Sequence, residues 1–328
     1  MIKIDEKLYR ICIINVYFGS LPNYFSLWLK SAAKNPNIDF LIFGDPLIYH
    51  NKIPNNVKMI KTSLAQIKLK ASQELDMQAV LDSPYKLCDY KVLYGLIFKE
   101  YLSNYDYWGH CDLDLIWGNL EKFFIENRIC DYDKFLPLGH LSLYRNTKDV
   151  NSRIMNSGGK LMYKDIYSTN EICRADEIWG IIPIYLNNNY SFFSKKIFAD
   201  ILVAHKRYTL ATTSFSNDDI IMNHKHQVFH WENGTLLLSF IDGGKIQSKE
   251  YAYIHFQQRP DYTVCFNVVD TDSFFITSNG FIQKKKELTA RIIKKYGGYR
   301  GFLVEWFEIH KNDFRYWIKE RIDIYFKK

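Results

Sequence analysis

Two aspartates stand two positions apart in the stretch YDYWGHCDLDLIWGNL, residues 105–120. Because side chains two apart on an extended strand point to the same side, we expect Asp112 and Asp114 to converge while Leu113 and Leu115 face the core. Carboxylates held close together repel each other unless a cation or a proton lies between them. Oxygen ligands favour Mg²⁺ or Mn²⁺, and an ion so held can also bind the oxygens of a diphosphate.

The two aspartates also have a plainer interpretation. One of them caps the turn before GNLEKFF (residues 118–124), and the other is solvated. A D-x-D sequence arises often by chance, so the elements around it must decide between a metal site and a turn.

Those elements alternate along residues 1–130. Continuous apolar runs are typical of strands buried on both faces, and apolar residues at helical spacing predict helices. The expected strands are residues 10–19, 39–45 and 57–63, and the expected helices are residues 23–35 and 85–102, the second leading into the strand before Asp112. This order predicts an α/β fold with a mostly parallel central sheet. Ligands bind at the carboxyl ends of the strands in such sheets, which is where the two aspartates would lie.

The net charge of +7 comes entirely from the end of the chain. Residues 284–328 hold 13 of the 43 Lys and Arg residues but 6 of the 36 Asp and Glu residues, so residues 1–283 are balanced. We therefore expect a catalytic domain over residues 1–283 and a basic, amphipathic helical tail over residues 284–328. The tail carries Trp306, Phe307, Trp317 and Tyr325 at roughly helical spacing.

This tail admits three interpretations. It binds an anionic membrane surface, as interfacial amphipathic helices do, or it packs on the main domain and presents a solvated basic face. Binding to nucleic acid is not expected, because no recognised motif accompanies the basic residues. The six cysteines form no C-x-x-C pair, and no apolar run of about 20 residues is present. We expect a cytoplasmic protein, which the first interpretation of the tail would make peripheral on the inner face of the cytoplasmic membrane.

Several stretches occur in an order that resembles the D-x-D glycosyltransferases of the GT-A fold. The resemblance is to bacterial enzymes of capsule and O-antigen loci, including an uncharacterised family, and it covers about residues 8–265. The stretches are NVYFG, FLIFGD, YKLCDYK, YWGHCDLDLIWGNL, LGHLSLYRN, RADEIWG and YIHFQQR. The D-x-D is the most specific of them. The resemblance implies a Rossmann-like, mostly parallel sheet flanked by helices, to which the tail would add a C-terminal helical appendage.

The resemblance also implies a donor and metal site. Asp112, Asp114 and His255 would hold Mn²⁺ or Mg²⁺, with His255 and Arg259 supplied by YIHFQQRP. The residues that would contact a nucleotide-sugar donor are Tyr17, Phe18, Gly19, Asp45, Lys86, Asp89, Lys91, Asp112 and Arg259. Ordinary alternatives remain open: core packing for the aromatic residues and for His255, and solvated helix charges for the residues between 86 and 91.

The catalytic group is expected in RADEIWG. Asp176 and Glu177 would stand at a helix start, where one faces the acceptor and the other caps the helix or pairs with Arg174. The motif resembles the acidic element that inverting GT-A enzymes use as a general base, whereas in retaining relatives a similar residue only binds the sugar, so the stereochemistry stays open. His140 would border the acceptor, with packing beneath it as the alternative.

The resemblance implies an enzyme, a Leloir-type glycosyltransferase. It would move a hexose, galactose-type, from a UDP-linked sugar to a growing surface polysaccharide or lipid-linked glycan. UDP-galactose or UDP-glucose is the expected donor, and galactofuranose is also compatible. Two other classes compete: a metal-dependent nucleotidyltransferase, and a non-catalytic, membrane-docked carbohydrate-binding subunit. The first normally has a Gly-rich, basic phosphate loop after the first strand, but YFGSLPNYF has one Gly and no Lys or Arg.

Overall fold

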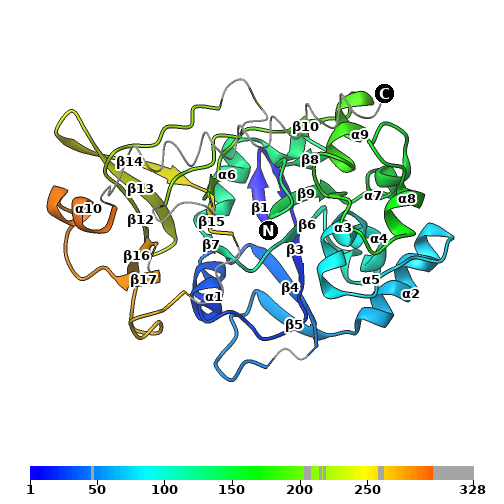
Figure 1. Cartoon of the computed structure of the whole chain (residues 1–328), viewed down its shortest axis with the longest axis horizontal. Helices are drawn as coiled ribbons and strands as arrows, with labels where there is room; N and C mark the ends of the chain where they lie inside the picture. The colour runs from blue at the N-terminus through cyan, green and yellow to red at the C-terminus, as the bar shows by residue number, and fades with distance from the viewer. Residues whose placement is uncertain are drawn as a thin grey trace, which may run out of the picture.

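The computed structural model describes residues 1–45, 48–202, 208–213, 216, 219–257, 262–278 and 280–297. Within these residues the chain forms a mixed α/β fold around a seven-stranded sheet, seen near the centre of Figure 1. The strand order is β10 (Phe192–Phe193), β8 (Lys134–Phe135), β9 (Leu141–Arg145), β6 (Tyr107–Cys111), β3 (Ile11–Val16), β4 (Ile38–Gly44) and β5 (Val57–Lys61).

The predicted mostly parallel sheet is confirmed. Strand β3 pairs in parallel with both β4 and β6, and β4 pairs in parallel with β5. Strand β9 runs antiparallel to β6 and β8, so the direction reverses just after the strand that precedes Asp112. The carboxyl ends of β3, β4 and β6 therefore meet at one edge of the sheet.

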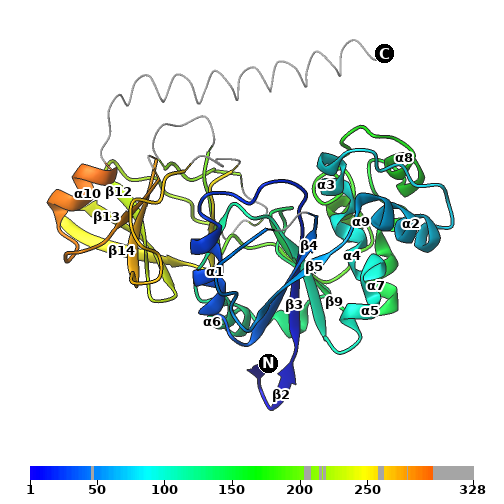
Figure 2. The ribbon, with the colours of Figure 1, turned by 90° about the horizontal axis from the view of Figure 1, so that it is seen from below.

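Both faces of this sheet are buried, as the continuous apolar runs predicted. Ile11 and Ile13 of β3 pack in one core cluster with α1 (Phe25–Ala33). Cys12 and Ile14 pack in a second cluster with α2 (Leu64–Leu75) and the helices that follow it. Figure 2 shows α1 and α6 (Leu120–Glu126) on one side of the sheet and α2 on the other.

The prediction of a single helix over residues 85–102 is wrong. The structure has five short segments there: η1 (Pro84–Lys86), α3 (Leu87–Tyr90), η2 (Lys91–Leu93), α4 (Tyr94–Ile97) and α5 (Lys99–Leu102). Packing, and not helical periodicity, sets this path. Gly95 lies so close to the Trp108 ring that an added Cβ would be 2.5 Å from it. Three polar side chains of the segment, Lys86, Asp89 and Lys91, are buried.

The chain forms two further larger sheets beside the central one. A small sheet has the order β11 (Ala199–Asp200), β15 (Tyr253–His255) and β7 (Leu115–Trp117). A five-stranded antiparallel sheet has the order β14 (Lys245–Tyr251), β13 (Thr235–Asp242), β12 (Gln227–Glu232), β16 (Ser273–Thr277) and β17 (Gly280–Gln283). The five-stranded sheet lies at one end of the molecule, away from α2 (Figure 1).

The remaining elements are short. They are β1 (Ile2–Ile4), β2 (Lys7–Tyr9), η3 (Ile129–Asp131), α7 (Lys148–Ser152), η4 (Arg153–Met155), α8 (Tyr163–Tyr167), α9 (Ile181–Asn187) and α10 (Ala290–Gly297). No helix in the described part of the chain has the length and apolar character needed to cross a bilayer.

Helix α10 is the described part of the expected tail. It packs on the five-stranded sheet through Ile293, which is fully buried, and through Tyr296, whose ring centroid lies 5.1 Å from that of Phe275. Trp306, Phe307, Trp317 and Tyr325 fall outside the described residues. The division of the chain at residue 283 and the amphipathic character of residues 298–328 stay predictions.

Candidate functional site

Asp112 and Asp114 lie in the bend between β6 and β7, just past the carboxyl end of β6. The backbone N–H of Asp112 donates to the carbonyl of His140 (3.1 Å), which fixes the start of the bend. Neither aspartate caps the following helix. The N-cap of α6 is Asn119, whose side chain accepts a hydrogen bond from the N–H of Lys122 (3.0 Å). Asn119, and not the D-x-D, therefore caps α6, and a turn-capping part for one aspartate stays an alternative.

Both aspartates meet a histidine from far along the chain. One ligand atom each of Asp112, Asp114 and His255 lie within 4.8 Å of one another. Strand β15 brings His255 there, because it pairs antiparallel with β7 and sets His255 opposite Leu115. The Nε2 atom of His255 lies 3.4 Å from Asp114 Oδ2. The predicted grouping of two carboxylates with one late imidazole is thus present in the fold.

A third carboxylate holds the other side of that imidazole. Nδ1 of His255 lies 2.9 Å from Asp200 Oδ1, and the side-chain amide of Gln257 donates to the same oxygen (3.0 Å). Burial lowers the pKa of His255, but Asp114 and Asp200 together outweigh it and raise that pKa to about 10. The site is thus built to hold positive charge.

This donor set fits a divalent ion such as Mn²⁺. Asp112 and Asp114 would supply oxygen ligands and His255 a nitrogen ligand, all three of which Mn²⁺ accepts. In metalloproteins the second ring nitrogen of a ligating histidine usually bonds a carboxylate, which fixes the ring orientation and tautomer. Asp200 already occupies that place. It was not predicted, since no local pattern in the sequence distinguishes it.

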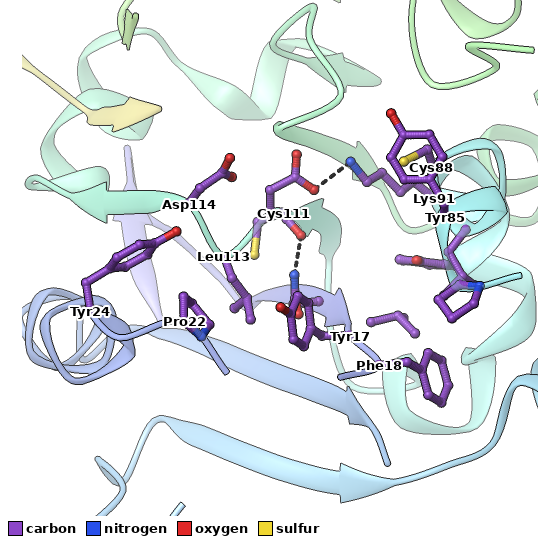
Figure 3. A pocket seen from close by; sticks show the side chains of 16 residues that line it. Tyr17, Phe18, Pro22, Tyr24, Tyr85, Cys88, Lys91, Cys111, Leu113 and Asp114 are labelled. Atoms are coloured by element: carbon purple, nitrogen blue, oxygen red, sulfur yellow. Dashed lines mark hydrogen bonds and ion pairs between the residues drawn. The ribbon is translucent and has the colours of Figure 1, made fainter. Parts of the chain in front are cut away.

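A cavity of about 480 Å³ opens beside the D-x-D. Its wall includes Tyr17 and Phe18, as well as Lys91, Asp112 and Asp114, so five predicted residues share one space (Figure 3). The other lining residues are Asn15, Val16, Pro22, Tyr24, Pro84, Tyr85, Leu87, Cys88, Tyr94, Cys111 and Leu113. The cavity lies at the carboxyl ends of β3 and β6, where ligands bind in mostly parallel sheets.

Two other predicted residues do not line this cavity. Gly19 follows Phe18 directly and adopts φ +125°, a conformation that favours glycine. Asp45 follows the end of β4, is exposed, and lies 3.6 Å from the ammonium of Lys61. Arg259 lies outside the described residues.

Lys91 joins the D-x-D to the predicted catalytic pair. Its Nζ lies 2.7 Å from Asp112 Oδ1 and 3.6 Å from Asp176 Oδ2, and it donates to the carbonyl of Gly139 (3.0 Å). Burial lowers the pKa of Lys91, but the two aspartates raise it well above its ordinary value. The ammonium therefore stays charged between two carboxylates.

Asp176 and Glu177 do not begin a helix, contrary to expectation. They lie in a turn in which the N–H of Ile181 bonds the carbonyl of Ala175 (2.8 Å), and α9 starts only at Ile181. Glu177 Oε1 accepts a hydrogen bond from the N–H of Gly139 (3.0 Å). Burial raises the pKa of Asp176 to about 7, although Lys91 acts in the opposite direction. A carboxyl with this pKa can exchange a proton near neutral pH.

Lys86 and Asp89 are fully buried and do not line the cavity. Lys86 Nζ lies 2.8 Å from Asp89 Oδ2 and also donates to the carbonyl of Ile166 (2.9 Å). Asp89 accepts hydrogen bonds from the N–H groups of Cys173 and Ala175, both at 2.9 Å. The buried pair therefore holds the chain that leads directly into Asp176.

His140 lies just before β9 and is buried beside the candidate metal ligand His255. Its Nδ1 lies 3.1 Å from the hydroxyl of Tyr253, and its ring centroid lies 4.3 Å from that of His255. The structure thus places His140 next to His255, and its predicted contact with an acceptor stays a prediction.

Three comparisons with known proteins can be set beside this geometry. The model of a family of unknown function, DUF6625, matches residues 13–285. No curated protein matches the chain. Among solved structures, the galactosyltransferase LgtC in complex with donor and acceptor sugar analogs is similar at 10% identity, over 58% of this chain and 75% of that one, with a TM-score of 0.35. An active-site mutant of LgtC is similar at 10% identity, over 75% and 87% of the two chains, with a TM-score of 0.38.

Proposed function

We propose that this chain, which belongs to the DUF6625 family of unknown function, is a metal-dependent glycosyltransferase of the GT-A type. It moves a hexose from a nucleotide sugar, of which a UDP-linked galactose or glucose is the expected form. The acceptor is a growing bacterial surface polysaccharide or a lipid-linked glycan. One observation carries the proposal: Asp112, Asp114 and His255 converge beside a cavity at the carboxyl ends of parallel strands.

The cavity suits the nucleoside part of such a donor. Tyr17, Phe18, Tyr24 and Tyr85 offer aromatic surface, and the D-x-D closes the same space with negative charge. An aromatic wall binds a base by stacking and apolar contact, whereas carboxylates alone would repel a diphosphate. The negative charge is useful to a diphosphate only when a cation lies between them, which is why the proposal includes a metal.

Each polar residue has a distinct part. Asp112, Asp114 and His255 hold the divalent ion, which supplies positive charge to the leaving diphosphate when bound. Asp200 orients His255. Lys91 keeps Asp112 in place and adds a fixed positive charge on the cavity wall.

Asp176 is the proposed catalytic carboxylate, with Glu177 as the second choice. If transfer inverts the anomeric configuration of the sugar, Asp176 accepts the proton of the acceptor hydroxyl, and its pKa of about 7 suits that proton transfer. If the configuration is retained, the same carboxylate binds the sugar. Glu177 is already hydrogen-bonded to the N–H of Gly139, so its oxygen is the better placed of the two to fix the turn.

The experiment that tests the function is a panel of nucleotides and sugar nucleotides, each with and without Mn²⁺ and without acceptor. We expect a UDP-sugar with Mn²⁺ to raise the melting temperature and to be slowly hydrolysed to UDP. A ligand at 100 times its dissociation constant stabilises the fold by about 2.7 kcal/mol, which a thermal melt resolves.

Other outcomes of the same panel identify the competing classes. Release of pyrophosphate from a nucleoside triphosphate would indicate a nucleotidyltransferase. Binding of glycans with no response to any nucleotide or metal would indicate a carbohydrate-binding subunit. Either result would overturn the proposed function.

A further inference from the structure

A fully buried lysine lies beneath the candidate site. Lys134 of β8 donates from Nζ to the carbonyl of Leu136 and to Ser142 Oγ, the latter at 2.8 Å. Among the residues that the structure describes, no carboxylate forms an ion pair with it. Burial lowers the pKa of Lys134 to about 7. Because burying an ammonium against neutral partners is costly, such a residue calls for an explanation.

The lysine's partners fix a loop of unusual backbone conformation. Leu136 has φ +76°, in the left-handed region that non-glycine residues seldom adopt. Its carbonyl is contacted by both Lys134 Nζ and Ser142 Oγ, the second at 3.0 Å. Ser142 Oγ also lies 3.1 Å from the carbonyl of Leu138. Three polar contacts thus hold the first turn of residues 136–140, which we call the bridging loop.

The bridging loop touches both halves of the site. The N–H of Gly139 donates to Glu177, and its carbonyl accepts from Lys91, each at 3.0 Å. The carbonyl of His140 accepts the N–H of Asp112 at 3.1 Å, and the His140 ring lies beside that of His255. Gly139 leaves no spare room, since an added Cβ would meet Asp176 Oδ2 at 2.1 Å.

We propose that Lys134 is a positioning residue that anchors the bridging loop, and that this loop sets the metal-binding residues and the Asp176–Glu177 pair in fixed relation. Only its catalytic meaning rests on the proposed function. Removing the Lys134 amino group beneath the loop then releases Asp112 on one side and the turn of Asp176 and Glu177 on the other. Both are reached through hydrogen bonds of the loop backbone.

The test compares hydrogen exchange in wild type and Lys134→Met, which removes the amino group and keeps the unbranched apolar part of the side chain. We expect the amides of Asp112 and Gly139 to exchange about tenfold faster or more, because the substitution leaves the buried carbonyl of Leu136 and the hydroxyl of Ser142 without the Lys134 donor. Amides of β3, such as Ile13, should change much less. A general loss of fold stability would raise the exchange rates of all these amides by a similar factor.

The control is Lys30→Met. Lys30 also donates to a backbone carbonyl, that of Val269 (3.2 Å), but it does so where α1 meets the loop that precedes β16. It should leave the amides of Asp112 and Gly139 unchanged. If Lys134→Met fails to fold, Ser142→Ala removes the other anchor of the same loop and must give the same local pattern.

A second readout is Mn²⁺ binding by titration, where Lys134→Met should raise the dissociation constant by about tenfold, the equivalent of one such hydrogen bond. Equal acceleration of all amides, or no acceleration in either anchor variant, would overturn the proposal. A wild type that binds no Mn²⁺ would instead count against the proposed function, and the exchange rates would still decide the role of Lys134.

Discussion

Asp200 and His255 stand directly opposite each other on the parallel strands β11 and β15, with Asp200 Oδ1 2.9 Å from His255 Nδ1. The ring's other nitrogen faces Asp114 at 3.4 Å. One imidazole is therefore held between two carboxylates of different roles. Asp114 faces the cavity and is a candidate metal ligand, whereas Asp200 is buried and orients the ring.

Asp200→Asn should weaken Mn²⁺ binding by about 10- to 100-fold, the usual effect of losing the carboxylate behind a ligating histidine. The amide keeps the shape of the side chain but loses its charge. Calorimetric titration with Mn²⁺ measures the change. Asp242→Asn, at an exposed aspartate in the β13–β14 hairpin, is the matched control and should bind as wild type does. Equal affinities in all three proteins would remove Asp200 from the site.

Asp114→Ala should abolish Mn²⁺-dependent binding of a sugar nucleotide while the fold survives. The ion loses one carboxylate ligand, and the apo protein loses a group that lies close to Asp112. Thermal melts with UDP-sugar and Mn²⁺ report binding, and circular dichroism reports folding. A variant with full metal-dependent turnover would contradict the metal-site interpretation of the D-x-D.

Asp176→Asn should lower sugar transfer by roughly 10²- to 10⁴-fold, the usual contribution of a positioned general base, with donor affinity kept. Initial rates at saturating donor measure the effect. Glu177→Gln is the paired variant. If it alone is impaired, the roles within the pair are reversed, and if both are near wild type, the turn is not catalytic.

The protonation of Asp176 should also make the stability of the fold decrease as the pH rises. Its pKa is raised from 3.8 to about 7 in the folded protein, so the folded state holds this proton more tightly than the unfolded state. The protonated carboxyl favours folding, and that contribution is lost as pH rises from about 4 to about 7. Asp176→Asn has no such loss.

Melting temperatures at pH 5 and pH 8 check this sign. Relative to wild type, Asp176→Asn should be more stabilising at pH 8 than at pH 5. The transfer rate of the wild type should in turn rise with pH through about 7, because the ionised carboxylate is the form that accepts a proton. A pH-independent difference in melting temperature would show that Asp176 is ionised throughout this range.

Deleting residues 298–328 tests the membrane interpretation of the tail. The cut is placed after α10, because that helix packs on the five-stranded sheet and its removal would expose Phe275 and Val228. We expect donor hydrolysis to be kept and binding to anionic liposomes to be lost. Wild-type binding should weaken with salt, since each Lys or Arg near such a surface contributes about 1 kcal/mol through electrostatics.

The rival interpretation of the tail predicts different behaviour. If its aromatic residues pack on the catalytic domain, the shortened protein would melt early or aggregate. The full-length protein would then ignore liposomes at any ionic strength.

The strands of the central sheet could be predicted because their signal is local. The apolar runs that form β3 and β4 pack into the core on both faces of the sheet. A continuous apolar run of this kind is typical of any strand that is buried on both faces. The prediction of one helix over residues 85–102 was wrong because the path of this segment is set by contacts with distant residues. Its apolar residues repeat as in a helix, but Gly95 packs against Trp108, and Lys86 and Asp89 bond a segment that lies 80 or more residues away.

The candidate site likewise contains residues that a local sequence pattern predicts and residues that no local pattern predicts. Asp112 and Asp114 are two positions apart, so the sequence by itself determined that two carboxylates would end a buried strand, and the resemblance added His255. Asp200, Lys134 and Gly139 have no local signature. They reach the site through the pairing of β11 with β15 and through the bridging loop, and such contacts depend on how strands and loops far apart in the chain are packed. Local spacing fixes which side chains share a strand or turn, but only the tertiary structure decides which strands and turns meet.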